Sequence, residues 1–400
     1  MNTNIVFPIL LSLLAIGWPA HSQTLAVALE QAWSLHPMAV VSDLRQSEIQ
    51  ARSDTAQGLT PGPASVSLAT LGDQLTANRG KQEWEVEVET PLWLPGQRHA
   101  RQGEAASAQK EFNAQQQALR LQIAGEVREV WWALAAARSR QALAGARLLA
   151  AQVLTSDVDR RLRAGELARV DANLAQVERL SAQADLEDAQ SELAQAEQDF
   201  RLLTGTTPAD PLSPEALPAV EPSLDAHPQL LAAAASVELA GAKLAFARRS
   251  PSEAPTLAVR LVRERADFSD AFADTLGVKL TIPLSMGARV RQELAGNRAE
   301  VLQSEREYTQ VQRRIASAKD TAQRLLKTAR SQLETAQTRV SLTQANLALA
   351  EKSFSLGESD LPTLLRARAA HFDAQALLSQ QQITGHAALS RFNQSMGVMP

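Results

Sequence analysis

The sequence contains no cysteine, few aromatic residues and little net charge. Without cysteine the chain can form no disulfide, thiolate zinc site, iron–sulfur cluster or cysteine nucleophile. A formal net charge of -4 provides no extended basic surface for nucleic acid. Aromatic residues make up 4% of the 400 residues, whereas alanine occurs 71 times. This composition favours long, closely packed helices over the thicker aromatic core that is usual in an enzyme of this length.

Residues 1–22 contain no Lys, Arg, Asp or Glu, and an apolar run within them is followed by the small residues Ala20 and Ser22. This pattern predicts a secretory signal peptide, residues 1–22, that is cleaved after Ser22. The basic residues that usually begin such a peptide are missing, so a buried helix or a membrane anchor stays an alternative. No other segment reaches the ~18 apolar residues of a transmembrane helix, so any further contact with a bilayer would have to be made by strands.

Four sequence landmarks occur twice in the same order, 191 or 192 residues apart. The pairs are His36-Pro37 and His227-Pro228, Pro91 and Pro283, Gly165 and Gly357, and Gly205 and Gly397. Such a constant offset indicates an internal duplication, with a first repeat at 23–207 and a second at 223–400. Residues 208–222 contain five prolines and no helical period, which predicts a linker between the repeats.

Proline is absent from 96–207 and from 284–361, and apolar residues recur there at helical spacing. Leu326, Leu333, Val340, Leu347 and Phe354 lie seven apart, a period that predicts coiled-coil packing. A turn that contains glycine interrupts each of these segments, at Gly165 and at Gly357. We therefore expect one long antiparallel helical hairpin in each repeat, at about 97–204 and about 287–397.

Alternating apolar and polar residues predict two strands in each repeat, at about 63–72 and 82–93 and at about 256–265 and 275–285. In the second strand, carboxylates occupy every odd position from Glu83 to Glu89, and Trp, Val, Val and Thr occupy the even positions. Strands of this length with polar connections are typical of an outer-membrane β-barrel, although a soluble sheet with one buried face alternates in the same way. Four strands are too few to close a barrel, and lipid does not tolerate open edges, so a barrel would need several copies; three copies supply twelve strands.

The duplicated halves, each with two strands and a long hairpin, resemble the TolC-like outer-membrane efflux factors over about residues 23–400. The motifs that carry this resemblance are the two His-Pro pairs, TPLWLPGQRHA (90–100) and IPLSMGARV (282–290) at strand-to-helix junctions, LRAGELARVD (162–171) and SLGESDLPTLL (355–365) at the hairpin turns, and the LLTG and SMG helix ends.

The resemblance implies a mainly α fold with membrane β structure. A homotrimer would form a 12-stranded barrel in the outer membrane of a Gram-negative bacterium and an α-helical tunnel across the periplasm. The implied partners are outer-membrane lipid, a periplasmic adaptor (membrane fusion) protein and an inner-membrane RND-type pump. The short length and the LPGQR junction are most similar to members that serve heavy-metal cation efflux. A duct for drugs, organic solutes or type I protein secretion is an alternative, and a soluble periplasmic coiled-coil adaptor is an alternative of another class.

The resemblance assigns adaptor contact to the hairpin turns, where glycine permits close backbone approach. Simple capping of the helices explains each glycine equally well. The predicted contact residues are Arg163, Ala164, Gly165, Glu166, Leu356, Gly357, Glu358 and Ser359.

In the family, acidic residues six and nine positions after this glycine often narrow the tunnel end. Asp171 fits this pattern in the first repeat, whereas Thr363 and Arg366 occupy the matching positions of the second. We expect Asp171 and Arg366 to form the closing contact of the gate.

Polar residues of the strands are expected to face the barrel lumen. These are Glu83, Glu85, Glu87, Glu89, Arg260 and Lys279. Such a row of carboxylates attracts cations, although a hydrated barrel interior is the simpler interpretation. The sequence has no phosphate-binding loop, nucleophile elbow or H-E-x-x-H helix, and no His-rich or Met-rich tract. We therefore expect neither enzymatic activity nor a cofactor or a resident metal.

Overall fold

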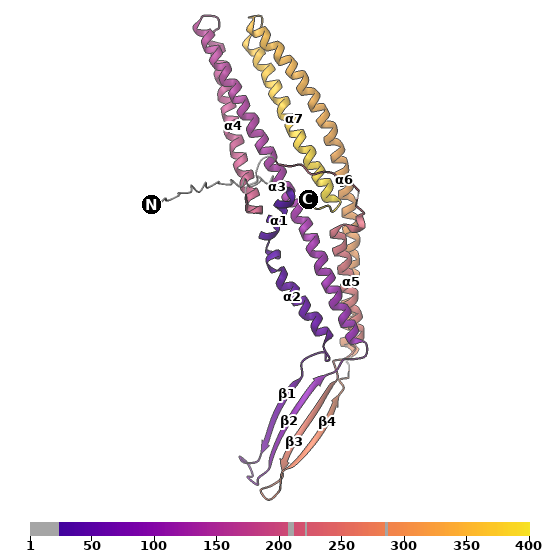
Figure 1. Cartoon of the computed structure of the whole chain (residues 1–400). Helices are drawn as coiled ribbons and strands as arrows, with labels where there is room; N and C mark the ends of the chain where they lie inside the picture. The colour runs from indigo at the N-terminus through magenta and orange to yellow at the C-terminus, as the bar shows by residue number, and fades with distance from the viewer. Residues whose placement is uncertain (1–23, 207–211, 221, 285–286) are drawn as a thin grey trace, which may run out of the picture.

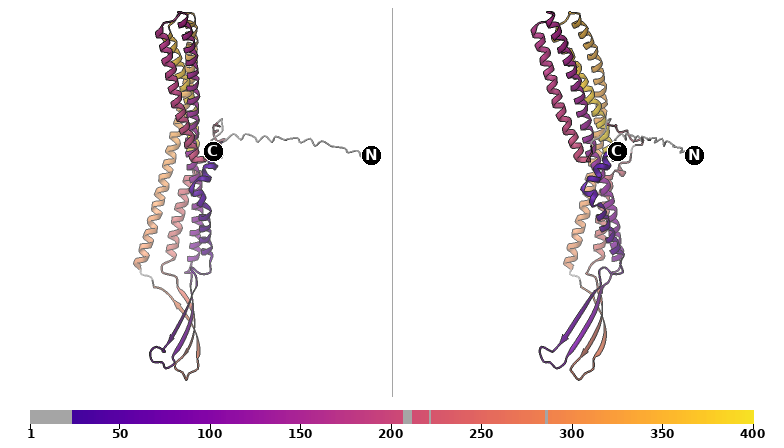
Figure 2. Two further views of the ribbon diagram at one scale, coloured as in Figure 1. Left: turned by 90° about the vertical axis from the view of Figure 1, so that its left-hand side faces the viewer. Right: turned by 60° about the vertical axis from the view of Figure 1, so that its left-hand side comes forward.

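The computed structural model describes residues 24–206, 212–220, 222–284 and 287–400. The predicted signal peptide lies outside these residues, as does part of the predicted linker. The molecule is elongated, with a four-stranded sheet at one end and two helical hairpins at the other (Figures 1 and 2). The first helix and the C-terminus lie near the middle of its length (Figure 1).

The two repeats build the same order of elements, apart from one extra helix in the first. The first repeat contains α1 (Leu25–Leu35), α2 (Pro37–Gln57), β1 (Ser65–Gly72), β2 (Gln82–Pro91), α3 (Gln97–Arg163) and α4 (Arg169–Thr204). The second contains a short 3-10 helix (Leu224–Ala226), α5 (Pro228–Arg249), β3 (Thr256–Arg265), β4 (Ala273–Thr281), α6 (Gly287–Ser355) and α7 (Leu361–Ser395). The expected fold class, two long hairpins and four strands in one chain, is confirmed.

The long helices have the predicted extent, whereas two strands end earlier than predicted. At 1.5 Å per residue the 67 residues of α3 and the 69 residues of α6 each extend about 100 Å. The strands β2 and β4 end at Pro91 and Thr281, earlier than the predicted 93 and 285, because Pro91 and Pro283 have no N–H for a strand hydrogen bond. Residue 285 lies outside the described residues.

The duplicated His-Pro pairs begin helices α2 and α5, which the sequence patterns did not predict. The Nδ1 atoms of His36 and His227 accept hydrogen bonds from the N–H groups of Met38 and Gln229, each at 3.2 Å. The following prolines occupy the first helical position, where a missing N–H has no cost. Each pair is therefore a helix start.

The duplicated glycines at the ends of α4 and α7 belong to the same joints as the His-Pro pairs. Gly205 and Gly397 have positive φ angles of 74° and 75°. A Cβ on Gly205 would lie 2.9 Å from Leu35, the residue before the first pair, and one on Gly397 would lie 2.8 Å from Pro228. In each repeat the end of the returning helix therefore packs directly on the His-Pro start, and a side chain at the glycine would separate them.

Helix α5 is long and apolar enough to cross a membrane by length and composition, with a mean hydropathy of 1.6. The prediction that no further segment would qualify is wrong by this measure. The helix contacts both α3 and α6, and Leu239, Ala240 and Leu244 are buried. Its apolar residues therefore contribute to helix packing in the middle of the molecule.

Small residues form the seams within the hairpins. In α4, Ala175, Ala182 and Ala189 lie seven apart and are buried against the hairpin. In α6, Ala322, Ala329 and Ala336 repeat this arrangement. Alanine at every seventh position lets two helices approach closely along their length, so the sevenfold period gives coiled-coil packing as predicted.

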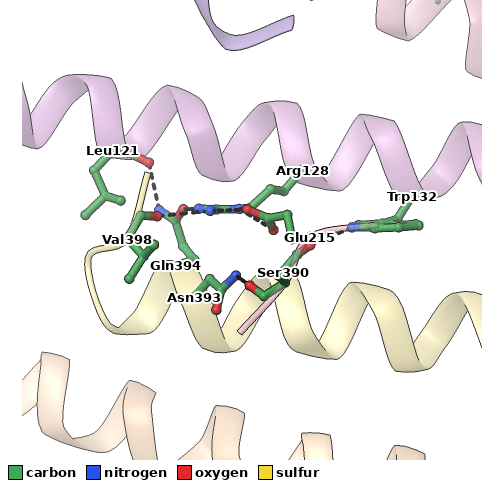
Figure 3. A network of polar contacts seen from close by, with 9 residues as sticks. Leu121, Arg128, Trp132, Glu215, Ser390, Asn393, Gln394 and Val398 are labelled. Carbon is green, nitrogen blue, oxygen red and sulfur yellow. Dashed lines mark hydrogen bonds and ion pairs between the residues drawn. The ribbon is translucent and has the colours of Figure 1, made fainter. Parts of the chain in front are cut away.

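A buried ion pair joins the linker to both repeats (Figure 3). Arg128 of α3 is 2% exposed; its Nε and Nη2 donate to the Glu215 carboxylate at 3.0 and 2.6 Å. The same guanidinium donates to the Gln394 side chain of α7 and to the Val398 carbonyl. Gln394 in turn donates to the Leu121 carbonyl at 2.7 Å. The segment predicted as a plain linker thus supplies the counter-charge of a core arginine.

We predict that Arg128→Ala strongly destabilises the protein, because it leaves the Glu215 carboxylate buried without a counter-charge, at a cost of about 3–5 kcal/mol. Arg391→Ala is the matched control, since Arg391 pairs with Glu129 at a half-exposed site where an ion pair contributes about 0–1 kcal/mol. Thermal unfolding followed by circular dichroism measures both variants. Equal effects, or no recovery in the double variant Arg128→Leu/Glu215→Leu, would contradict this account.

The buried His227 predicts a dependence of stability on pH. Desolvation lowers the pKa of its imidazole below the ordinary 6.5, against a weaker opposing effect of a hydrogen bond with the Gln394 backbone. Protonation also removes the Nδ1 acceptor that caps α5. A lowered folded-state pKa means that this contribution is fully present above pH 6.5 and is lost as the pH falls below it.

We therefore expect His227→Asn, which keeps a cap acceptor but does not titrate, to lose less thermal stability than the wild type between pH 7.5 and pH 5. His36→Asn, the same change at the duplicated position, keeps the buried His227 and is the control; it should lose more thermal stability over this pH range than His227→Asn. Identical pH profiles for the wild type and His227→Asn would refute the assignment.

Candidate functional site: a two-faced sheet and two glycine turns

The four strands form one antiparallel sheet in the order β1-β2-β3-β4. The register sets Val86 between Leu68 and Leu261, and Leu261 beside Leu276. Since side chains alternate between the two faces of a strand, these residues share one face of the sheet. We call it the apolar face; its exposed members are Val66, Leu68, Trp84, Val86, Val88, Val259, Leu261, Leu276, Val278 and Leu280.

The apolar face has no cover within the described chain. These ten side chains are 40–71% exposed, and no helix packs on the sheet in the three views (Figures 1 and 2). In a soluble sheet the apolar side would be the buried one. A contiguous exposed apolar surface across all four strands indicates contact with lipid or with another protein.

The opposite face, called the charged face, brings the six predicted lumen residues together. Glu87 lies beside Arg260, and Glu89 is aligned with Lys279 across Ala258. Arg260 Nη1 lies 3.5 Å from an oxygen of Glu85. The four glutamates of the row are half-buried along one side of β2. Within the described chain the face is a solvated charged surface, and whether it lines a lumen depends on the assembly.

The two hairpin turns lie at the end of the molecule opposite the sheet (Figure 1). Gly165 and Gly357 have positive φ angles of 84° and 74°. In the first turn the N–H of Glu166 donates to the Arg161 carbonyl and that of Gly165 to the Leu162 carbonyl. The second turn repeats both bonds, so each glycine ends its helix in a Schellman motif.

The geometry of the two turns fits helix capping by Gly165 and Gly357, and it also leaves room for a partner protein to contact them. A Cβ built on either glycine meets no atom within 4 Å, so no packing inside the chain requires glycine there. Leu356 beside the second glycine is 63% exposed. Seven of the eight predicted contact residues are exposed, and Ser359 is half-buried. The turns therefore present a surface whose backbone shape is fixed.

The residues predicted to form the gate lie next to these turns, and each has a local partner. The Asp171 carboxylate accepts from the Ala168 N–H at 3.2 Å, which satisfies the start of α4. Arg366 donates to the Pro362 carbonyl and to the Thr363 hydroxyl. Within one chain Asp171 and Arg366 therefore have local partners other than each other.

Asp360 is an acidic residue of the second turn that the predictions missed. Its carboxylate accepts from the Thr363 N–H at 3.1 Å and caps α7. Hydrogen bonds from Thr363 hold the pKa of this carboxyl below its ordinary range. Aspartate immediately before a Leu-Pro helix start is a recognisable cap, so the sequence pattern contained this signal.

The tips of the two hairpins are packed together. Leu154 and Val158 of α3 form a buried cluster with Phe354 of α6 and with Leu361 and Leu364 of α7. The Arg161 guanidinium lies 5.1 Å from the centre of the Phe354 ring. The sequence could not indicate this contact because it joins residues about 200 positions apart. Among the described residues, no group of three or more His, Asp or Glu side chains is arranged to hold a metal ion.

Comparisons with known proteins agree with this architecture. Residues 220–398 match the model of a family described as outer membrane efflux protein, a range that covers almost all of the second repeat. No curated protein matches the sequence.

Solved structures match the chain almost throughout. They include CusC, described for transmembrane channel formation (TM-score 0.77, 17% identity, 94% of this chain and 92% of that chain). The outer membrane protein VceC of Vibrio cholerae has a TM-score of 0.75 at 16% identity, over 94% and 96% of the two chains. The Campylobacter jejuni outer membrane channel CmeC has a TM-score of 0.74 at 14% identity, over 99% and 94%.

CusC and CmeC are both described as channels. The chain has the fold of TolC-like outer-membrane channels, and its second repeat matches the outer membrane efflux protein family.

Proposed function

We propose that three copies of the chain form an outer-membrane exit duct of a tripartite efflux pump in a Gram-negative bacterium. The observation that carries the proposal is the exposed apolar face, which extends over all four strands. Its strands contain 8 to 10 residues, close to the roughly 9–11 residues that a tilted strand needs to cross the outer membrane. The charged face would then line a water-filled lumen, with Glu83, Glu85, Glu87, Glu89, Arg260 and Lys279 inside.

The open edges of the sheet support an assembly of several copies. β1 and β4 each pair with one strand only, so each has a row of unpaired backbone groups. Lipid does not tolerate such edges. Because neighbouring strands alternate in direction, β4 of one copy runs antiparallel to β1 of the next and can continue the ladder. Three copies close a ring of twelve strands.

The outermost helices of the hairpin layer support the same ring. Val170, Val177 and Leu180 of α4 are at least half exposed. At 100° per residue they lie on the side of α4 opposite its buried alanine seam. Leu342 and Leu349 lie seven residues apart on α6 and are likewise exposed, and α6 does not pack against α4 in the same chain. A ring buries one stripe against the other.

We predict that Val177→Cys/Leu349→Cys, in a chain without other cysteines, gives covalent trimers with a short bis-maleimide. Both positions lie within about one helical turn of the same height above the sheet. The control pair Val177→Cys/Leu325→Cys moves the second thiol 24 residues, about 36 Å, along α6. Denaturing gels measure the products. Monomers only, or equal cross-linking of the control, would rule out this ring.

The hairpin turns are proposed to dock on a periplasmic adaptor, which connects the duct to an inner-membrane RND-type pump. This docking is supported by the exposed, open surroundings of Gly165 and Gly357, at the end farthest from the proposed membrane.

Asp171, Thr363 and Arg366 are proposed to narrow the tunnel beside these turns, with Asp171 of one copy meeting Arg366 of another. Heavy-metal cations are the proposed cargo on the strength of the LPGQR junction, with drugs, other organic solutes or secreted protein as the alternative.

A deletion strain complemented with variants tests docking and cargo together. Gly165→Asn keeps a residue that tolerates positive φ but adds a side chain at the proposed contact. We expect the melting temperature to be nearly unchanged, and survival on zinc, cobalt, cadmium, copper or silver salts to fall towards that of the deletion strain.

Two controls make this result specific. Gly103→Asn lies on α3 where a Cβ likewise meets nothing within 4 Å, and it should complement fully. Full complementation by Gly165→Asn would mean that Gly165 only caps its helix and that adaptor docking does not need it. Sensitivity of the deletion strain to dyes, detergents and antibiotics alone would keep the duct and overturn the metal cargo.

A further inference from the structure

Two arginines lie on the apolar face of the sheet, at the end farthest from the helices. The register places Arg263 beside Trp84 and Asp274, and Arg265 beside Gln82. Residues at alternate positions share a face, so Arg263 and Arg265 continue the row of Val259 and Leu261. The apolar row of β4 continues to Ile282, eight residues beyond Asp274. Because Arg263 is aligned with Asp274, it lies about 26 Å along the strands from Ile282.

The two guanidinium groups converge on one aromatic ring. The Cζ atoms of Arg263 and Arg265 lie 5.3 and 4.8 Å from the centre of the Phe272 ring. Arg265 Nε donates to the Gly80 carbonyl at 3.1 Å, and its Nη1 and Nη2 have no acceptor among the described residues. Arg263 forms an exposed ion pair with Asp274, whose Oδ1 lies 3.8 Å from the Arg263 Nε, a separation longer than a hydrogen bond. Two positive charges thus share one site with unused donors.

The loops around this site hold each other in place. The Asp73 carboxylate accepts from the N–H groups of Arg79 and Gly80, at 2.7 and 3.2 Å. The Phe268 N–H donates to the Arg79 carbonyl. Gly80 has a φ of +99°, and a Cβ there would lie 2.5 Å from the Phe268 nitrogen. The loop between β1 and β2 therefore packs directly against the loop between β3 and β4. These contacts hold Arg263 and Arg265 in place without a bound ligand.

We propose that Arg263 and Arg265 bind the phosphate group of an outer-leaflet lipid whose chains lie along the apolar face. The inference rests on the proposed membrane location, which puts this end of the sheet at the outer surface. Guanidinium N–H groups match phosphate oxygens in pairs, and the aromatic ring below them restricts their movement. Arg260 on the same strand points to the charged face and is paired with Glu85, so it cannot serve this site.

Native mass spectrometry of the detergent-extracted trimer, titrated with defined lipids, tests the site. The probes are bisphosphorylated lipid A, zwitterionic phosphatidylethanolamine and inorganic phosphate. We expect lipid A to bind more tightly than phosphatidylethanolamine, and Arg263→Gln/Arg265→Gln to weaken lipid A binding by about tenfold or more. Arg260→Gln is the matched control and should stay within about twofold of the wild type.

Each outcome decides a separate point. Unchanged lipid A binding in the double variant, or equal binding of phosphatidylethanolamine, would overturn the site. Displacement of lipid A by inorganic phosphate would assign the arginines to a free anion instead. If the double variant no longer forms trimers, Phe272→Leu, which removes only the ring, should still weaken lipid A binding. A wild-type protein that never forms trimers would overturn the proposed function, and this inference with it.

Discussion

Backbone N–H and C=O groups in a hydrocarbon layer have no water to bind, and the sheet of this chain ends on two strands with unpaired edges. Its apolar side is also its exposed side, so a single copy is incomplete in water and in lipid. Pairing of β4 of one copy with β1 of the next would remove the open edges, and lipid would cover the apolar side. The exposed stripes on α4 and α6 lie at the two borders of the helical layer, where the same ring would cover them.

Contacts in the middle of the molecule join the two repeats. Arg128 and Glu215 place charges from α3 and from the linker in the interior, and Gln394 and Val398 bring the C-terminus to the same point. The His-Pro starts and the glycine ends then fix how each returning helix meets the next segment. The long hairpins and the sheet extend in opposite directions from this centre (Figure 1).

Periodicity predicted the long elements well because α3, α6 and the strands each repeat one pattern over many residues. It gave no indication of α1, α2 and α5, which are short or, like α2, lack a clear apolar face. Glu215 was hidden in a proline-rich segment that resembled a plain linker, and its partner Arg128 is 87 residues away. The face shared by the four glutamates was predictable from alternation alone, whereas Arg263 and Phe272 meet only through the register of β3 and β4.

A membrane-spanning sheet requires lipid over the apolar face, and single cysteines introduced into this cysteine-free chain test that directly. Val86→Cys and Glu87→Cys are neighbours on β2 that point to opposite faces. In reconstituted vesicles, a charged thiol reagent should modify the cysteine at position 87 and spare the one at position 86. A lipid-phase quencher should affect only a fluorophore attached at position 86. Equal modification of both positions by the charged reagent would contradict a membrane-spanning sheet.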